Sequence, residues 1–203
     1  MKKYVVYFLG VVIMAFGVAI STFHGLGASP FDTLTFNIST IANFDLGITM
    51  FIFNGLFLLI YFLKYKNKDI YISIIVIFLF SISVNLFVKL LTPFIVNNEL
   101  WFRLILFIVG FMLTNVGIAM VEISSLSKTA YECFNAFVSN TFFKKMSYGK
   151  SRIIVDISVS AVAALLGIIF INSIGSSGIG TIFYMIFTGP CVQILMKLMS
   201  TKK

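Results

Sequence analysis

Charged residues are scarce in this sequence: they make up 11% of its 203 residues, whereas a typical soluble domain is about one quarter charged. Apolar residues account for 60%, Phe alone occurs 24 times, and the mean hydropathy is +1.06. A chain of this composition cannot cover itself with polar surface, which excludes a water-soluble domain. We therefore expect a protein whose surroundings are lipid.

The residues that build catalytic and metal sites are also few. His24 is the only histidine, so the paired-histidine motif of a metalloprotease is absent, as is the Gly-x-Ser-x-Gly motif of a rhomboid-type protease. We interpret His24 as an interfacial residue at the outer end of the first helix. Cys133 and Cys191 are not spaced as metal ligands or as a redox pair, and we interpret both as small packing residues. The sequence predicts no enzyme, no metal site and no cofactor.

Six apolar runs match the roughly 20 helical residues that a bilayer core requires. The predicted spans cover residues 4–23, 48–63, 70–91, 101–121, 153–171 and 179–198. The first run is longer than the core of a usual signal peptide and lacks a clean cleavage site, so we interpret it as a retained helix. The expected fold is therefore an all-α, polytopic transmembrane helix bundle.

The formal net charge of +8 would suggest nucleic acid in a soluble protein, but here the basic residues gather in alternate connections between the spans. The basic residues of one side are Lys2, Lys3, Lys64, Lys66, Lys68, Lys144, Lys145, Lys150, Arg152, Lys197, Lys202 and Lys203. Only Lys89 and Arg103 fall near the other side. Because cytoplasmic loops are rich in Lys and Arg, we expect a bacterial plasma-membrane protein with both termini in the cytoplasm, no nucleic-acid partner and the lipid bilayer as its surroundings.

An internal repeat appears when the sequence is shifted by 100 positions. The superposed identities are Gly10 with Gly110, Gly17 with Gly117, Ala19 with Ala119, Leu26 with Leu126 and Ser39 with Ser139. Two inserted residues then bring Gly47 onto Gly149 and Asn54 onto Asp156. We predict two copies, residues 1–100 and 101–203, that form one membrane domain. Since each copy contains three spans, the second should lie upside down relative to the first, as in transporters built from inverted repeats.

Each copy also contains a short helix after its first span, at residues 29–41 and 129–142. Ser29 can cap the first helix, Pro30 suits its first position, and Asp32 lies in the first turn; Thr129 and Glu132 repeat this arrangement. At about 13 residues these helices are too short to cross a bilayer. They could re-enter the membrane or lie at its surface, and the short links to the next span favour shallow insertion.

A flexible break precedes each short helix, with Gly25 and Gly27 in the first copy and Ser127 in the second. Irregular backbone at membrane depth is tolerated where it lines a cavity, and a helix N-terminus attracts anions. The breaks and caps are therefore the predicted pathway for a small solute or ion, with an anionic or amphoteric solute expected. The carboxylates of Asp32 and Glu132 could bind a proton, a cation or an amine, or could simply cap their helices.

Asp156 lies inside the predicted fifth span, where a central carboxylate costs roughly 2.5 to 3.5 kcal/mol on insertion scales. It therefore needs a partner or a wet pocket. Arg152 lies four residues earlier on the same helix face, so the two could form a structural ion pair or serve a solute pathway. Asn54, the counterpart of Asp156, completes the predicted site.

Three segments of the sequence resemble the YczE/YyaS/YitT family of bacterial membrane proteins. They are Gly25-Leu26-Gly27-Ala28-Ser29-Pro30-Phe31-Asp32-Thr33-Leu34, Gly149-Lys150-Ser151-Arg152 with Asp156, and Gly178-Ile179-Gly180-Thr181 with Thr188-Gly189-Pro190. The resemblance implies a multi-span plasma-membrane protein, and it looks closest to the YczE-like branch because no soluble tail follows the last helix. The second copy departs from the first, with Ala130 in place of Pro30 and Ser127 in place of Gly27.

Two functions from different classes follow from these features. The first is a small-solute permease with its pathway between the two copies. The alternative is an accessory or regulatory membrane protein, such as the substrate-binding component of a larger importer, that works by binding a partner or a second copy of itself. Ala15 and Ala19, four residues apart on the first span, would favour the alternative because small residues allow close contact with another helix.

Overall fold

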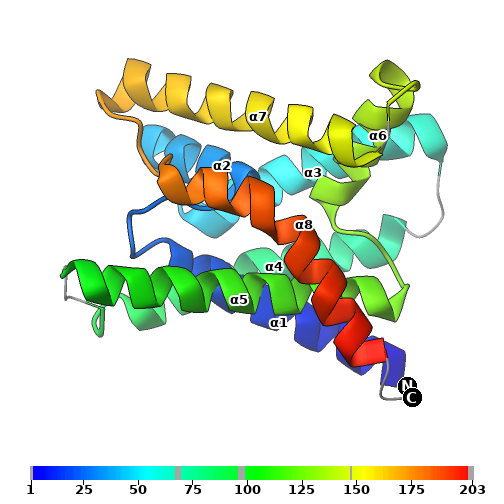
Figure 1. Ribbon diagram of the computed structural model, residues 1–203, viewed down its shortest axis with the longest axis horizontal. Coiled ribbons are helices and arrows are strands. Elements are labelled where there is room, and N and C mark those ends of the chain that lie inside the picture. Colours follow the sequence, from blue (N-terminus) through cyan, green and yellow to red (C-terminus); the bar gives the residue numbers. More distant parts are fainter. Residues whose placement is uncertain (1, 67–69, 96–98, 147, 201–203) are drawn as a thin grey trace.

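The computed structural model describes residues 2–66, 70–95, 99–146 and 148–200. Within these ranges it contains eight α-helices, one short π-helix and no strands (Figure 1). The helices are α1 (Lys2–Ser21), α2 (Pro30–Ala42), α3 (Leu46–Tyr65), α4 (Ile70–Leu91), α5 (Leu100–Ser124), α6 (Ala130–Phe142), α7 (Tyr148–Leu166), the π-helix η1 (Gly167–Ile171) and α8 (Ile179–Ser200). The predicted all-α bundle is confirmed.

In the described part of the chain, six helical segments are long and apolar enough to cross a membrane: α1, α3, α4, α5, α7 continued by η1, and α8. Large apolar side chains such as Leu63 and Ile179 stay exposed on the outside of the bundle, as expected for a surface that faces lipid. Helix α7 begins at Tyr148, five residues before the predicted span, because Gly149 to Arg152 continue the helix. The predicted six-helix, membrane-protein-like bundle is therefore observed.

Helices α1 and α5 form the most extensive contact of the bundle. A Cβ atom added to Gly17 would lie 2.5 Å from the backbone nitrogen of Thr114, and one added to Gly117 would lie 2.6 Å from the carbonyl oxygen of Gly10. The glycines therefore let the two backbones touch. Because Gly10 meets Gly117 while Gly17 meets Gly110, the two helices run antiparallel, as Figure 1 also shows.

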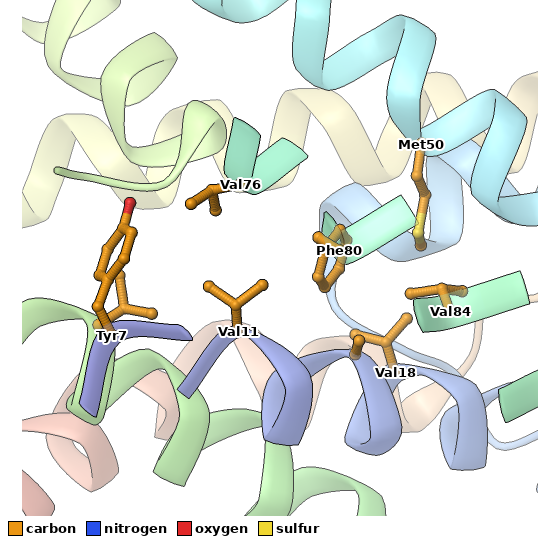
Figure 2. Close-up of a cluster of buried hydrophobic side chains, with 9 residues drawn as sticks. Tyr7, Val11, Val18, Met50, Val76, Phe80 and Val84 are labelled. Carbon is orange, nitrogen blue, oxygen red and sulfur yellow. The ribbon is translucent and has the colours of Figure 1, made fainter. Parts of the chain in front are cut away.

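The short helices pack mainly against long helices from the other half of the sequence. Helix α2 packs on α7 and more lightly on α3, whereas α6 packs on α3 and more lightly on α7. These four helices form one layer, with α1, α4 and α5 beneath it and α8 crossing between the layers (Figure 1). A cluster of buried apolar side chains from α1, α3, α4 and α5 joins the layers, and Figure 2 shows Tyr7, Val11, Val18, Met50, Val76, Phe80 and Val84 from this cluster.

Both predicted helix caps are present. The Ser29 hydroxyl accepts a hydrogen bond from the Asp32 amide at 3.3 Å and donates one to the Asp32 carboxylate at 2.7 Å. The Thr129 hydroxyl accepts a hydrogen bond from the Glu132 amide at 3.3 Å. The helices consequently begin at Pro30 and Ala130, one residue after each cap.

The expectation that the short helices insert shallowly is wrong. Eight of the 13 residues of α2 are buried, and its first turn contacts the first turn of α6, with the rings of Phe31 and Tyr131 5.4 Å apart. Both tips border a cavity shared with Asn54 and Thr114, which lie in the middle parts of α3 and α5. The chain reaches this depth through the non-helical segments 22–29 and 125–129, and each short helix then leads back toward the end from which the chain entered.

The basic connections gather at one end of the bundle. Helices α1 and α7 begin there, and α3, α5, α6 and α8 end there (Figure 1). Lys64 near the end of α3 accordingly donates a hydrogen bond to Thr141 near the end of α6 at 3.1 Å. Lys68, Lys202 and Lys203 lie outside the described residues. We refer to this end as the basic end; its placement on the cytoplasmic side stays a prediction.

Candidate functional site: a cavity between the tips of the short helices

A cavity of about 540 Å³ lies where the first turns of α2 and α6 meet. Its wall comes from all eight α-helices, and it extends along α7 and α8 to Lys150 and Gln193, which are exposed. The cavity therefore reaches the surface toward the basic end. Eight of the predicted pathway residues line it: Ser29, Pro30, Asp32, Asn54, Thr129, Glu132, Arg152 and Asp156.

Three predicted residues lie outside this cavity. Gly25 and Gly27 border a smaller cavity of about 150 Å³ on the opposite side of Asp32, and Ser127 borders another of about 360 Å³ beside Ser73. Gly27 has a left-handed φ of +110°, and a Cβ there would lie 2.7 Å from the Thr181 amide nitrogen. The first break thus serves mainly to dock the chain against the start of α8, where the Gly180 amide donates a hydrogen bond to the Leu26 carbonyl at 2.8 Å.

The second half contributes a network of ionic and hydrogen-bonding groups to the cavity. Arg152 Nη1 lies 2.6 Å from Glu132 Oε1, and its Nε lies 3.8 Å from Asp156 Oδ2. The Tyr131 hydroxyl donates a hydrogen bond to Asp156 Oδ1. The predicted intrahelical pair of Arg152 and Asp156 is therefore present, but the shorter ionic contact joins α7 to α6. One guanidinium thus serves both carboxylates.

Tyr131 keeps its proton in this network. Burial, and then the neighbouring Asp156 carboxylate, raise the pKa of the Tyr131 hydroxyl well above its usual value. The hydroxyl therefore remains a donor to the carboxylate at neutral pH. Its ring packs against Phe31 and Phe57, so the polar network of α6 and α7 is held against the apolar tip of α2.

Asp32 occupies the equivalent place in the first half but has a different environment. Its side chain is buried and is hydrogen-bonded to Ser29, and among the described residues no basic group lies within ion-pair distance. Burial raises the pKa of the carboxyl to about 6, against a smaller lowering by the Ser29 hydroxyl. The predicted repeat register, which aligns Asn54 with Asp156, also aligns Met50 with Arg152, and Met50 is a fully buried apolar residue.

Two further tyrosine-centred features were not foreseen. Tyr131 was not among the predicted site residues; its counterpart Phe31 lacks the hydroxyl that donates a hydrogen bond to Asp156. Tyr184 on α8 also lines the cavity, and its hydroxyl lies 3.1 Å from the Ser21 hydroxyl. Tyr184 could have been identified from the sequence as a polar aromatic residue within a largely apolar predicted span. Gly189 and Pro190, inside α8, line the cavity as well.

His24 and the small residues of α1 have internal roles. The His24 side chain is fully buried rather than interfacial: its Nδ1 accepts a hydrogen bond from the Leu26 amide at 3.1 Å. Burial, and then the nearby Arg103 charge, lower the pKa of His24 to about 4, so its ring is neutral. Ala15 and Ala19 are also fully buried inside the bundle, which removes them as a contact surface for a partner.

Cys133 packs among buried apolar residues, as its interpretation as a packing residue requires. It lies in a cluster with Leu58, Ile77 and Ala130. Burial raises the pKa of its thiol to about 11, which keeps it protonated at neutral pH. Cys191, the second cysteine, is half-buried on α8.

These observations define a class: a membrane-protein-like, all-α bundle with six candidate spans and two short helices that meet at a central cavity. The chain belongs to a family described as "Family of unknown function (DUF6198)", whose model matches residues 1–197. It is 24% identical over 194 residues to the "Uncharacterized protein YyaS" of Bacillus subtilis (strain 168), which covers 96% of this chain and 92% of that protein. No solved structure matches it significantly. The YyaS-type family resemblance is confirmed; the assignment to the YczE-like branch stays a prediction.

Proposed function

We propose that this protein is a small-solute transporter whose solute binds in the central cavity, between two inverted halves formed by residues 1–100 and 101–203. One observation carries the proposal. A single cavity is bounded by the first turns of α2 and α6, and each of these turns comes from a different half of the chain. Irregular segments and helix ends at membrane depth are stable only where protein or water satisfies their polar groups, which is typical of transporter binding sites.

The helix contacts support the inverted arrangement. If α1 to α4 are exchanged with α5, α6, α7 and α8 in that order, the antiparallel contact of α1 with α5 maps onto itself. The contact of α1 with α4 maps onto that of α5 with α8, and the contact of α2 with α7 maps onto that of α6 with α3. A two-fold axis between α1 and α5 accounts for all of these relations.

One relation breaks this equivalence and supports alternating access. Helices α3 and α4 pack closely, and the Gly47 amide donates a hydrogen bond to Asn85 Oδ1 at 2.7 Å, whereas α7 and α8 make few contacts and nothing lies within 4 Å of a Cβ placed on Gly149. The two halves therefore adopt different conformations. Exchanging them would close α7 on α8, separate α3 from α4 and open the cavity toward the other end.

Transport is tested without choosing a solute in advance. The protein is reconstituted in sealed liposomes and incubated with a small-molecule extract of bacterial cells, and the solutes retained inside are identified by mass spectrometry. We expect at least one solute to accumulate above protein-free liposomes. Ile118→Trp, which fills the cavity from α5, should abolish the accumulation, whereas Ile108→Trp on the exposed face of the same helix should not.

Two results would contradict the proposal. One is an identical solute content in liposomes with and without the protein. The other is accumulation that the cavity-filling variant Ile118→Trp leaves unchanged, because the pathway would then lie elsewhere.

A further inference from the structure

The three carboxylates of the central cavity differ in what neutralises them. Glu132 and Asp156 share the guanidinium of Arg152, and Asp156 also receives the Tyr131 hydroxyl. Asp32 is buried like Asp156, but the described hydrogen bond of its carboxylate is with the Ser29 hydroxyl of its own cap. A buried carboxylate without a basic partner is costly and needs either a proton or a cation.

The predicted sequence repeat accounts for the absence of a basic partner of Asp32 among the described residues. The position equivalent to Arg152 holds Met50, whose side chain is fully buried in the cluster of Figure 2. At these two positions the first half therefore has the acid of the ion pair, Asp32, and an apolar residue in place of the base. That acid borders the central cavity on one side and the smaller cavity of about 150 Å³ on the other.

On this basis, and resting on the proposed function, we propose that the cavity binds an organic ammonium ion with an apolar body, and that Asp32 is the carboxylate that pairs with the ammonium group. In the second half, Arg152 is the positive partner of Glu132. In the first half, the ammonium group of the ligand is the positive partner of Asp32.

The wall of the cavity fits the apolar body of such a ligand. Helices α1, α4 and α5 contribute apolar side chains to it together with Thr114, and the described lining residues from these three helices include no charged side chain. The aromatic rings of Phe31, Tyr131 and Tyr184 also border the cavity, and aromatic faces attract ammonium groups. An inorganic cation fits less well because it requires a shell of several oxygen ligands, whereas the Ser29 hydroxyl is the only described side chain that is hydrogen-bonded to the Asp32 carboxylate.

An anionic solute is disfavoured by the same geometry. Each short helix has a carboxylate in its first turn, Asp32 in α2 and Glu132 in α6, so the positive helix ends are already neutralised. Arg152 is engaged by two carboxylates. Lys150, at the exposed mouth of the cavity, is the remaining basic residue among the described lining residues.

The test compares three probes that share one apolar body and differ in charge: 2-phenylethylammonium, 2-phenylethanol and 3-phenylpropanoate. Binding to the full chain in lipid nanodiscs is measured by isothermal titration calorimetry at pH 8, where Asp32 is ionised and the amine is protonated. We expect the ammonium probe to bind at least tenfold more tightly than the alcohol, and the carboxylate probe to show no saturable binding.

Variants then assign the preference to Asp32. Asp32→Asn should lower the affinity for the ammonium probe at least tenfold and leave that for the alcohol unchanged, and Asp32→Glu should keep the preference. Asp45→Asn is the matched control, because Asp45 is an exposed carboxylate that pairs with Lys89 away from the cavity. Thermal unfolding without probe identifies any variant that is not folded.

The inference is overturned if native protein binds the alcohol as tightly as the ammonium probe, prefers the carboxylate probe, binds none of the three, or retains its preference in Asp32→Asn. Accumulation of a neutral or anionic solute in the liposome experiment would at the same time leave the transporter proposal standing. Failure of both experiments would contradict both the transporter proposal and the proposal of ammonium binding.

Discussion

At the scale of single residues, the buried Asp32 carboxyl should make stability depend on pH. Its folded-state pKa of about 6 lies above the ordinary value of 3.8. Between these two values the folded protein holds a proton that the unfolded chain has released. The free energy of unfolding therefore falls as the pH rises from about 4 to about 6, and stays reduced above that.

Asp32→Asn removes this penalty while keeping an oxygen that accepts the Ser29 hydrogen bond. We expect the variant to be more stable than native protein at pH 8, by up to about 3 kcal/mol since one pKa unit corresponds to about 1.4 kcal/mol. Near pH 4 the difference should vanish. Reversible unfolding in detergent at both pH values measures it. A variant that is less stable than native protein at pH 8 would show that Asp32 serves the fold rather than a ligand.

The helix caps and the ion pairs of Arg152 show what the sequence can predict at the scale of single residues. Ser29 with Asp32 and Thr129 with Glu132 were predicted, because a cap involves residues three apart in the chain. The contact of Arg152 with Glu132 was not, because it joins two helices and depends on how they pack. The pairing of Arg152 with Asp156 was predicted, since residues four apart on a helix lie on one face.

At the scale of helices, the crossing of α1 and α5 depends on four glycines. A methyl group at Gly17 would lie 2.5 Å from the Thr114 amide nitrogen, which is too close without a backbone shift. At Gly55 on α3 nothing lies within 4 Å of the added atom. The two positions therefore distinguish a glycine required for packing from one that is tolerated.

Gly17→Ala should destabilise the bundle by roughly 1 to 3 kcal/mol, the usual cost of overpacking a close contact. Gly55→Ala should leave stability unchanged or raise it by up to about 1 kcal/mol, because Ala favours a helix more than Gly does. Both are measured by unfolding in mixed detergent micelles. Equal effects of the two substitutions would show that the α1 to α5 crossing is not limited by backbone contact.

The short helices show where prediction at this scale fails. Their existence, caps and approximate bounds followed from the sequence, but their depth did not. The short links to α3 and α7 suggested shallow insertion, whereas the segments 22–29 and 125–129 carry the chain inward before each helix begins. The distance that these two segments cover could not be predicted from the sequence, because an irregular segment of a given number of residues can be compact or extended. The packing role of Gly27 could not be predicted either, because its close contact is with Thr181, more than 150 positions later in the sequence.

At the scale of the whole molecule, the sequence predicted the membrane-like bundle from its composition and long apolar runs, and the family from short segments that resemble it. It placed eight of its eleven candidate residues at one cavity, because the repeat picks out equivalent positions in both halves. It could not show that α3 packs closely on α4 whereas α7 makes few contacts with α8.

The central claim is that the tips of α2 and α6 share one solute cavity, reached from the basic end. Labelling of single cysteines in sealed vesicles tests it most directly, with Ser29→Cys or Thr129→Cys placed in a background lacking Cys133 and Cys191, and with membrane-impermeant maleimide added to one side at a time. Cysteines at Asp45 and Lys145, at opposite ends, identify the two sides. We predict that both tip positions react from the side that labels position 145 and are protected together by 2-phenylethylammonium or by a solute found in the liposome experiment. Labelling of the two tips from opposite sides, or of neither, would contradict the account.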